Sequence, residues 1–86
     1  MELFLTEQFE QAYQKLTDAE RRGVNKALSL LGDNLRHPSL RVKKMEGRQN
    51  IWEACPSKRL RMTFELKEGI IIMRNVGEHD KVLKKS

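Results

Sequence analysis

The sequence of 86 residues predicts an α+β fold, in which two N-terminal helices pack on a twisted antiparallel sheet of three to four strands. Apolar residues recur at helical spacing between residues 6 and 35, and they alternate with polar residues in the C-terminal half. Two apolar helical stripes need a surface to cover, and the downstream strands supply one. Glu2 to Leu5 is a candidate short edge strand. Residues 1–86 are therefore expected to form a single domain.

Capping residues divide the helical region into two helices. Thr6 is expected to cap a first helix that runs to about Leu16. Thr17 and Glu20 form a capping box, in which the hydroxyl and the carboxylate satisfy backbone N–H groups reciprocally, so a second helix begins there. That helix ends before Pro38, which cannot continue it. Its apolar stripe consists of Val24, Ala27, Leu28, Leu31 and Leu35.

The segment from Arg59 to Leu66 has the clearest strand pattern. Apolar and polar residues alternate, which is typical of a half-buried antiparallel strand. One face carries Leu60, Met62, Phe64 and Leu66, and the outward face carries Arg59, Arg61, Thr63 and Glu65. A guanidinium on this outward face, with apolar neighbours pointing the other way, is well suited to bind a phosphate.

Further strands are expected on both sides of this segment. Residues 51–55 and 70–76 are rich in apolar residues and predict strands in meander order with it. Turn residues at 56–58 and 67–69 join the three strands. Residues 40–45 alternate weakly and predict a fourth strand.

The composition favours a folded, soluble and basic protein. Hydrophobic residues make up 38% and charged residues 34% of the chain, and the formal net charge is +5. Such basicity is typical of a protein that binds nucleic acid, a ribosome or an acidic partner, although a solubilising charge excess gives the same composition. No apolar run approaches the roughly 18 residues of a membrane span, and the N-terminal run is too short for a secretory signal. The expected location is the cytoplasm, without membrane contact.

Cysteine and histidine are too few for a disulfide framework or a usual structural zinc site. Cys55 is the single cysteine, and His37 and His79 are the two histidines. No phosphate-binding glycine loop is present. We therefore expect no metal and no cofactor. His37, which precedes Pro38, is expected to be a turn or packing residue, and Trp52 is most simply a core residue.

Basic residues cluster before and within the predicted strands. Together they predict a two-part cationic groove for a polyphosphate chain such as RNA. Its members are Arg41, Lys43, Lys44 and Arg48 in the first part, and Lys58, Arg59 and Arg61 in the second. The alternative is a solvated face whose cations pair with Glu46, Glu53 and Glu65.

Arg61, His79 and two glutamates are the candidate catalytic residues. If its strand faces a cleft, Arg61 can stabilise charge on a phosphate in a transition state; the alternative is a structural salt bridge to Glu53 or Glu65. His79 can exchange a proton near neutral pH, or it is a plain surface histidine. Glu46 or Glu53 can act as a base toward a ribose hydroxyl, or form ordinary ion pairs.

Several short motifs are specific when they are taken together. They are His37-Pro38-Ser39-Leu40, Lys43-Lys44-Met45-Glu46-Gly47, Ile51-Trp52-Glu53-Ala54, Leu60-Arg61-Met62-Thr63-Phe64 and Gly77-Glu78-His79-Asp80. With the two leading helices, their order resembles the RelE/ParE toxin superfamily of bacterial toxin–antitoxin systems over nearly the whole chain. The resemblance implies a compact domain with two helices packed on a twisted antiparallel sheet.

The resemblance also implies an activity. RelE-like toxins cut mRNA in the ribosomal A site without a metal, by attack of the messenger's own 2′-hydroxyl on the adjacent phosphate. Arg61 matches the sheet arginine of the family that contacts this phosphate, and His79 stands where several relatives carry a catalytic histidine. Arg74 lies on the neighbouring strand, where RelE-like toxins also use an arginine. Trp52 and Ala54 stand where RelE has two lysines.

A protein partner follows from the same resemblance. A cognate antitoxin, acidic in part, is expected to fold on the basic surface or over the helices. DNA is expected to be bound only by the toxin–antitoxin complex. Cys55 stands where relatives often carry an arginine. Two other functions remain open: a ParE-like gyrase inhibitor without catalysis, and a degenerate toxin that acts as a partner-binding module.

Overall fold

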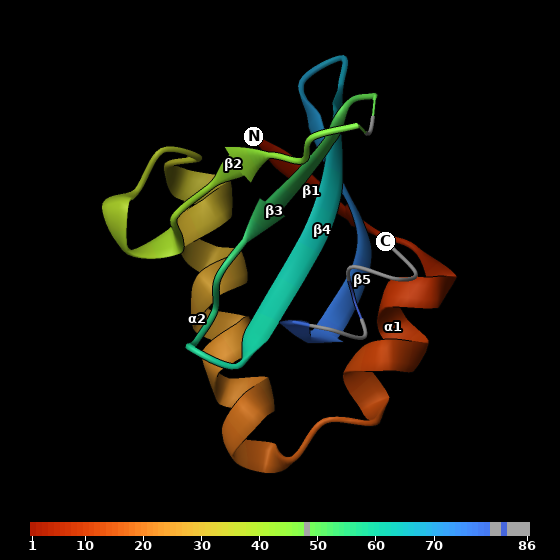
Figure 1. Ribbon diagram of the computed structural model, residues 1–86, viewed down its shortest axis with the longest axis vertical. Helices are drawn as coiled ribbons and strands as arrows, with labels where there is room; N and C mark the ends of the chain where they lie inside the picture. Colours follow the sequence, from red (N-terminus) through yellow and green to blue (C-terminus); the bar gives the residue numbers. More distant parts are fainter. Residues whose placement is uncertain (48, 80–81, 83–86) are drawn as a thin grey trace.

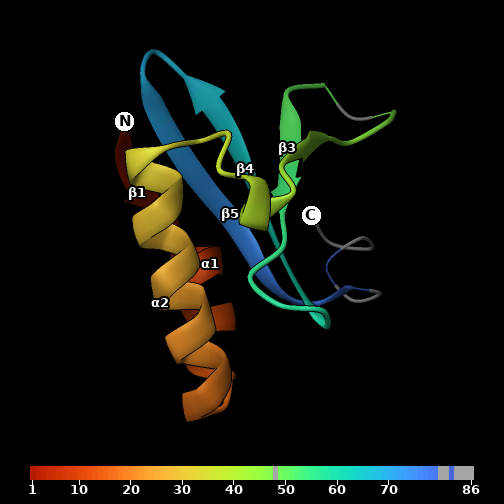
Figure 2. The ribbon, with the colours of Figure 1, turned by 90° about the vertical axis from the view of Figure 1, so that its left-hand side faces the viewer.

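The secondary structure elements form one mixed sheet with two helices on one of its faces (Figures 1 and 2). The computed structural model describes residues 1–47, 49–79 and 82. Within these residues the elements are β1 (Glu2–Leu5), α1 (Glu7–Gln14), α2 (Asp18–Asp33), the 3₁₀ turn η1 (Pro38–Leu40), β2 (Lys43–Lys44), β3 (Ile51–Ala54), β4 (Leu60–Lys67) and β5 (Ile70–Glu78). The strand order is β1-β5-β4-β3-β2. The face that α1 and α2 leave uncovered is called the helix-free face below.

The expected sheet of three to four antiparallel strands is wrong in strand number and in one direction. The described residues form five strands, and β1 runs parallel to β5, in register from Glu2 opposite Ile70 to Leu5 opposite Met73. The candidate edge strand is therefore real, but it pairs with the far end of the chain. A tight hairpin cannot join two parallel strands, and the chain between β1 and β5 contains both helices and the strands β2, β3 and β4.

The helices begin where their capping residues predict. The Thr6 Oγ1 atom accepts a hydrogen bond from the Phe9 N–H (3.2 Å) and donates one to the Met73 carbonyl oxygen (2.7 Å). Thr6 therefore starts α1 and also fixes it to β5. The capping box at Thr17 and Glu20 is confirmed, with both reciprocal hydrogen bonds present.

The core lies between the helices and the sheet. α2 buries Val24, Ala27 and Leu31 at helical spacing, as the apolar stripe predicts. From the sheet, Met62 and Phe64 of β4 are fully buried against them. These contacts determine which face of every strand is the helix-free face, because successive side chains of a strand point to opposite faces.

The hairpin of β4 and β5 contains a tight turn and a bulge. Glu68 and Gly69 both have positive φ, as a two-residue type I′ turn requires. Further along, Phe64 lies opposite Met73 while Thr63 lies opposite Asn75, so Arg74 is the extra residue of a β-bulge. The bulge shifts the inward–outward alternation of the β5 side chains by one residue. As a result, Val76 points into the core and Asn75 points to the opposite face.

The predicted strand at residues 40–45 is mostly wrong. Only Lys43 and Lys44 form a strand, because η1 precedes them and Arg41 has a left-handed φ of 50°. Leu40 is buried in the core, and His37 caps η1 by accepting the Ser39 N–H at Nδ1 (3.2 Å). The expectation that His37 is a turn residue is confirmed.

We expect Thr6→Val to lower the free energy of unfolding by about 1–2 kcal/mol, because both the helix cap and the hydrogen bond to Met73 are lost. Urea unfolding measured by circular dichroism tests this value. Thr6→Ser keeps the hydroxyl and is the matched control, with stability close to that of the parent chain. Equal loss in both variants would contradict the role of the hydroxyl.

Candidate functional site

A row of four polar side chains crosses the helix-free face. Strand pairing places Lys43 of β2 opposite Glu53 of β3, Glu53 opposite Thr63 of β4, and Thr63 opposite Asn75 of β5. The neighbours of Thr63 in β4 point into the helix-covered core, so Thr63 and its row point to the other face. This polar row is the centre of the candidate site.

A buried carboxylate lies within the polar row. The Glu53 side chain is 5% exposed, and its Oε1 atom lies 3.3 Å from the Nζ atom of Lys43, whose side chain is 71% exposed. Glu46, the other predicted base, lines the same small hollow of about 300 Å³ as Glu53 and Lys43. The structure thus brings both candidate carboxylates to one place, and it pairs Glu53 with a cation.

Arg61 and His79 occupy neighbouring strand ends. Arg61 of β4 lies opposite Gly77 of β5, and His79 follows two residues later. The His79 N–H donates to the carbonyl oxygen of Arg59 (3.1 Å), which holds the end of β5 beside the turn that precedes β4. The sequence-predicted arginine and histidine therefore come to the same corner of the sheet.

The guanidinium of Arg61 also has a structural role. Its Nη1 atom donates to the carbonyl oxygens of Ser57 (3.2 Å), Lys58 (3.1 Å) and Leu60 (2.8 Å). It thereby holds together the turn between β3 and β4. The alternative of a salt bridge to Glu53 or Glu65 is wrong, because these glutamates pair with Lys43 and Arg74 instead.

Arg74 lies on the helix-free face, because its neighbour Met73 points into the core. Its Nη1 atom lies 2.7 Å from the Glu65 Oε2 atom, and both side chains are about one third exposed (35% and 32%). The predicted third arginine therefore shares a face of the sheet with Glu65 of β4. The ion pair holds the guanidinium in one orientation.

The predicted two-part cationic groove is divided by the sheet. Lys43 lies on the helix-free face, but Lys44 lies opposite Trp52, whose side chain points toward the helix-covered face. Arg41 lines a cleft with Trp52 on that same side. Lys58 and Arg59 are exposed in the turn before β4, near Arg61. Arg48 lies outside the described residues.

Two residues of the polar row were missed by the sequence analysis. Thr63 was expected on a solvated face, yet it is fully buried, and its Oγ1 atom has no hydrogen-bond partner in the part of the chain that the structure describes. Asn75 was not predicted as a site residue, because the pattern of apolar and polar residues in the sequence does not indicate the bulge that turns Asn75 to this face. Its Oδ1 atom accepts the Val76 N–H (2.9 Å).

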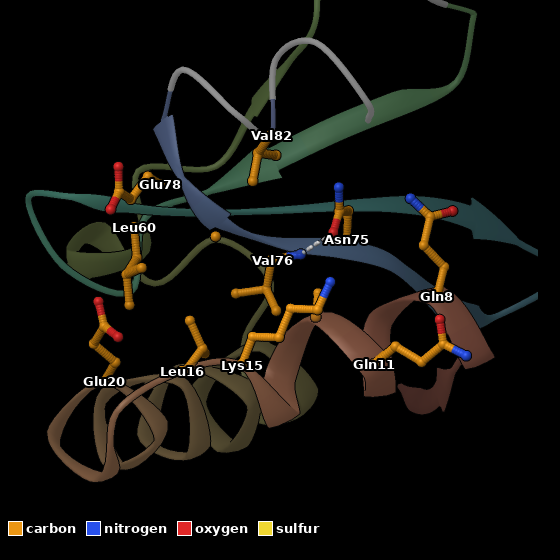
Figure 3. Close-up of a pocket in the computed structure, with 12 residues that line it drawn as sticks. Gln8, Gln11, Lys15, Leu16, Glu20, Leu60, Asn75, Val76, Glu78 and Val82 are labelled. Carbon is orange, nitrogen blue, oxygen red and sulfur yellow. Dashed lines mark hydrogen bonds between the residues drawn. The ribbon is translucent and has the colours of Figure 1, made fainter.

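A hollow of about 350 Å³ opens along β5 where β1 has ended (Figure 3). Lys15 and Leu16, which follow α1 in the chain, line one side of it, and Val82 lies on the other side of β5 (Figure 3). Val82 approaches the backbone of Gly77 so closely that a Cβ atom there would lie 3.3 Å from a Val82 methyl group. The glycine thus leaves room for Val82 beside the Arg61 corner.

The described residues offer no metal centre and no membrane span. No group of three or more His, Cys, Asp and Glu side chains among residues 1–47, 49–79 and 82 is placed to hold a metal ion. No helix in the same part of the chain is long and apolar enough to cross a membrane.

Solved structures with this fold are bacterial and archaeal toxins. YafQ from E. coli strain BL21(DE3) is 12% identical, covers 94% of this chain and 96% of its own, and has a TM-score of 0.79. A chain of the RelB–RelE antitoxin–toxin complex from Methanococcus jannaschii is 16% identical over 94% of this chain and 95% of its own, with a TM-score of 0.78. The YoeB/ParE toxin from Agrobacterium tumefaciens is 15% identical over 92% of this chain and 99% of its own, with a TM-score of 0.75.

These similarities establish the fold. The chain folds as these toxins do, so the fold that the resemblance implies is confirmed. Sequence comparison adds no closer relative, since no family model and no curated protein matches the chain.

The ion pair in the polar row makes a testable contribution to stability. Lys43→Met leaves the buried Glu53 carboxylate without its cation, and we expect a loss of about 1–3 kcal/mol in the free energy of unfolding. Lys44→Met is the matched control, because Lys44 forms no ion pair with the residues that the structure describes. Its loss should change the free energy of unfolding by less than about 0.5 kcal/mol. Chemical denaturation of both variants at low and high salt measures the difference; equal effects would show that Lys43 is not coupled to Glu53.

Proposed function

We propose that this protein is the toxin of a toxin–antitoxin system and a ribosome-dependent, metal-independent mRNA endonuclease. One observation carries the proposal: pairing of β4 with β5 brings Arg61 and His79 to one corner of the helix-free face, next to the polar row. A guanidinium, an imidazole and a carboxylate on one rigid surface are the groups that phosphodiester cleavage needs.

The proposed reaction is an internal transesterification in the A-site codon. The 2′-oxygen of a ribose attacks the adjacent phosphorus, a new P–O bond forms, and the bond to the 5′-oxygen of the next nucleotide breaks. A base removes the 2′-hydroxyl proton, and an acid protonates the leaving 5′-oxygen. The products are a 2′,3′-cyclic phosphate and a 5′-hydroxyl.

Each role falls to a residue of the helix-free face. The Arg61 guanidinium, beyond its bonds to the turn carbonyls, neutralises charge on the phosphorane, and His79 donates the proton to the leaving oxygen. Glu53 or Glu46 takes the proton of the 2′-hydroxyl. Arg74, Lys58 and Arg59 bind neighbouring phosphates of the messenger.

The proposed protein partner is a cognate antitoxin that neutralises the toxin. The neighbours from Methanococcus jannaschii and E. coli were solved as RelB–RelE and DinJ–YafQ antitoxin–toxin complexes. A net charge of +5 favours an acidic partner over a basic one. DNA would be bound through the complex rather than by this chain alone, and the cytoplasm is the location in which ribosomes and such a partner meet it.

A second candidate is a gyrase inhibitor of the ParE kind. One structural neighbour is named a YoeB/ParE toxin, and a shared fold does not decide between the two functions. Two of the predicted phosphate-binding cations, Lys43 and Arg74, are already ion-paired, which favours a binding surface over a strongly cationic channel. A degenerate toxin that only binds a partner is the third candidate.

Cleavage of mRNA on programmed ribosomes tests the nuclease. We expect the purified protein to cut within the A-site codon, and Arg61→Ala to lower the rate by about 10²–10³-fold. His79→Gln should lower it by about 10²-fold or more. A 2′-deoxy substitution at the cleaved nucleotide should abolish the cut, because the nucleophile is then absent.

Controls separate catalysis from stability. Lys26→Ala changes an exposed lysine of α2, which lies away from the helix-free face, and should leave the rate within about twofold. Unfolding of Arg61→Ala is measured in parallel, because this residue also holds the turn before β4. Growth arrest without cleavage would favour gyrase inhibition, and neither cleavage nor growth arrest would favour the partner-binding module.

A further inference from the structure

A second cleft lies on the helix-covered side of the sheet, away from the polar row. It has a volume of about 530 Å³ and lies where α2 ends, beside η1 and the inner faces of β3 and β4. Its apolar floor is formed by Leu35, Val42, Trp52 and Leu66, and its polar rim by Arg36, His37 and Arg41. We call it the α2–β3 cleft.

The apolar floor is only partly covered by the chain itself. Its four side chains are half-buried and pack against the edge of the core rather than within it. A half-buried cluster of leucine, valine and tryptophan leaves apolar surface in contact with water. Covering that surface with a partner is favourable by roughly 25 cal/mol for each Å² removed from water.

The rim offers hydrogen-bond donors without a matching acid. Arg36 and Arg41 are exposed, neither forms an ion pair with any residue in the described part of the chain, and no carboxylate lines the cleft. The backbone N–H of Ser39 donates to Nδ1 of His37, so the ring proton of the neutral imidazole is on Nε2, which is also a donor.

The indole of Trp52 adds one more unsatisfied donor. Its Nε1 atom is buried and has no hydrogen-bond partner among the described residues. Leaving a buried N–H unpaired costs about 1–3 kcal/mol. Arg41, which has a left-handed φ of 50°, adds backbone strain at the same place. Unpaired hydrogen-bond donors and backbone strain at the same cleft are more typical of a binding site than of a hydrophobic core, in which buried polar groups are hydrogen-bonded.

We propose that the α2–β3 cleft binds an amphipathic segment of a partner protein that carries aliphatic side chains and carboxylates. The aliphatic side chains cover the floor, and the carboxylates, which only accept hydrogen bonds, pair with Arg36 and Arg41. Single-stranded RNA fits the cleft less well, because it prefers exposed aromatic faces on which bases stack, and the floor is mainly aliphatic with its one indole half-buried.

A partner in this cleft would leave the helix-free face uncovered. Trp52 and Glu53 are consecutive residues of β3, so their side chains lie on opposite faces of the sheet. The docking itself does not depend on the proposed nuclease activity. Only the identification of the partner as the antitoxin rests on the proposed function.

The single tryptophan of the chain lines the cleft and serves as the reporter. A random library of 12-residue peptides is selected on the immobilised full chain, and enriched peptides are synthesised and titrated while Trp52 fluorescence is followed. We expect them to combine leucine, isoleucine or valine with aspartate or glutamate. Arg36→Ala with Arg41→Ala should weaken their binding by about tenfold or more, as should replacing their acids by amides.

Lys58→Ala with Arg59→Ala is the matched control, because it removes two cations from the turn before β4 and should leave peptide binding unchanged. Enriched peptides without acids, or equal binding to both double variants, would overturn the proposal. Trp52 fluorescence is also followed with a 12-nucleotide single-stranded RNA. If the RNA changes the fluorescence of the parent chain but not that of the Arg36→Ala, Arg41→Ala variant, the cleft binds nucleic acid instead and the proposal is overturned. The mRNA cleavage rate of the Arg36→Ala, Arg41→Ala variant should equal that of the parent chain, so loss of peptide binding and failure of the nuclease assignment are distinguishable.

Discussion

The pairing of β4 with β5 determines where the functional side chains lie. The two strands are the longest of the sheet, and the extra residue Arg74 changes the register between their halves. With this insertion, Met73 and Val76 both point into the core, while Asn75 between them turns to the helix-free face. Without it, the alternation would send Asn75 inward and Val76 outward. One inserted residue therefore aligns the polar row and leaves Arg61 opposite Gly77.

Charged side chains on the helix-free face form structural contacts, and the same side chains are the candidate ligand-binding groups. Arg61 binds three carbonyl oxygens of a turn, and Lys43 compensates the buried Glu53. Such contacts hold side chains in fixed orientations, which lowers the reorganisation needed when a phosphate binds. They also mean that removing one of these cations changes stability as well as binding. Activity losses at these positions are meaningful only beside a measurement of folding.

The helices and the central strands were predictable from local signals. Capping at Thr6 and Thr17 and the period-two pattern of residues 59–66 depend on neighbours in the sequence, so they can be read without the fold. The parallel partner of β1 could not be predicted, because it lies about 68 residues away, as the register of Glu2 with Ile70 shows. The bulge could not be predicted either, because in the sequence Arg74 is simply the one charged residue of an apolar strand and nothing marks it as an extra residue.

Pairing partners were the least predictable part of the candidate site. The salt bridge considered for Arg61 does not form, and its bonds to the turn carbonyls were not expected; they arise because these carbonyls are within reach of the guanidinium. Lys43 and Lys44 look equivalent in sequence, yet the pleat places them on opposite faces of β2. The α2–β3 cleft follows from η1, which replaced an expected strand and turned Arg41 toward Trp52.

The proposal of an RNA site on the helix-free face is tested most directly by nuclear magnetic resonance of the labelled His79→Gln chain with a 12-nucleotide single-stranded RNA. The account predicts that backbone amide shifts change for Arg61, Thr63 and Gly77, while the indole N–H signal of Trp52 stays in place. Changes confined to Trp52 and α2, with the polar row unaffected, would contradict it.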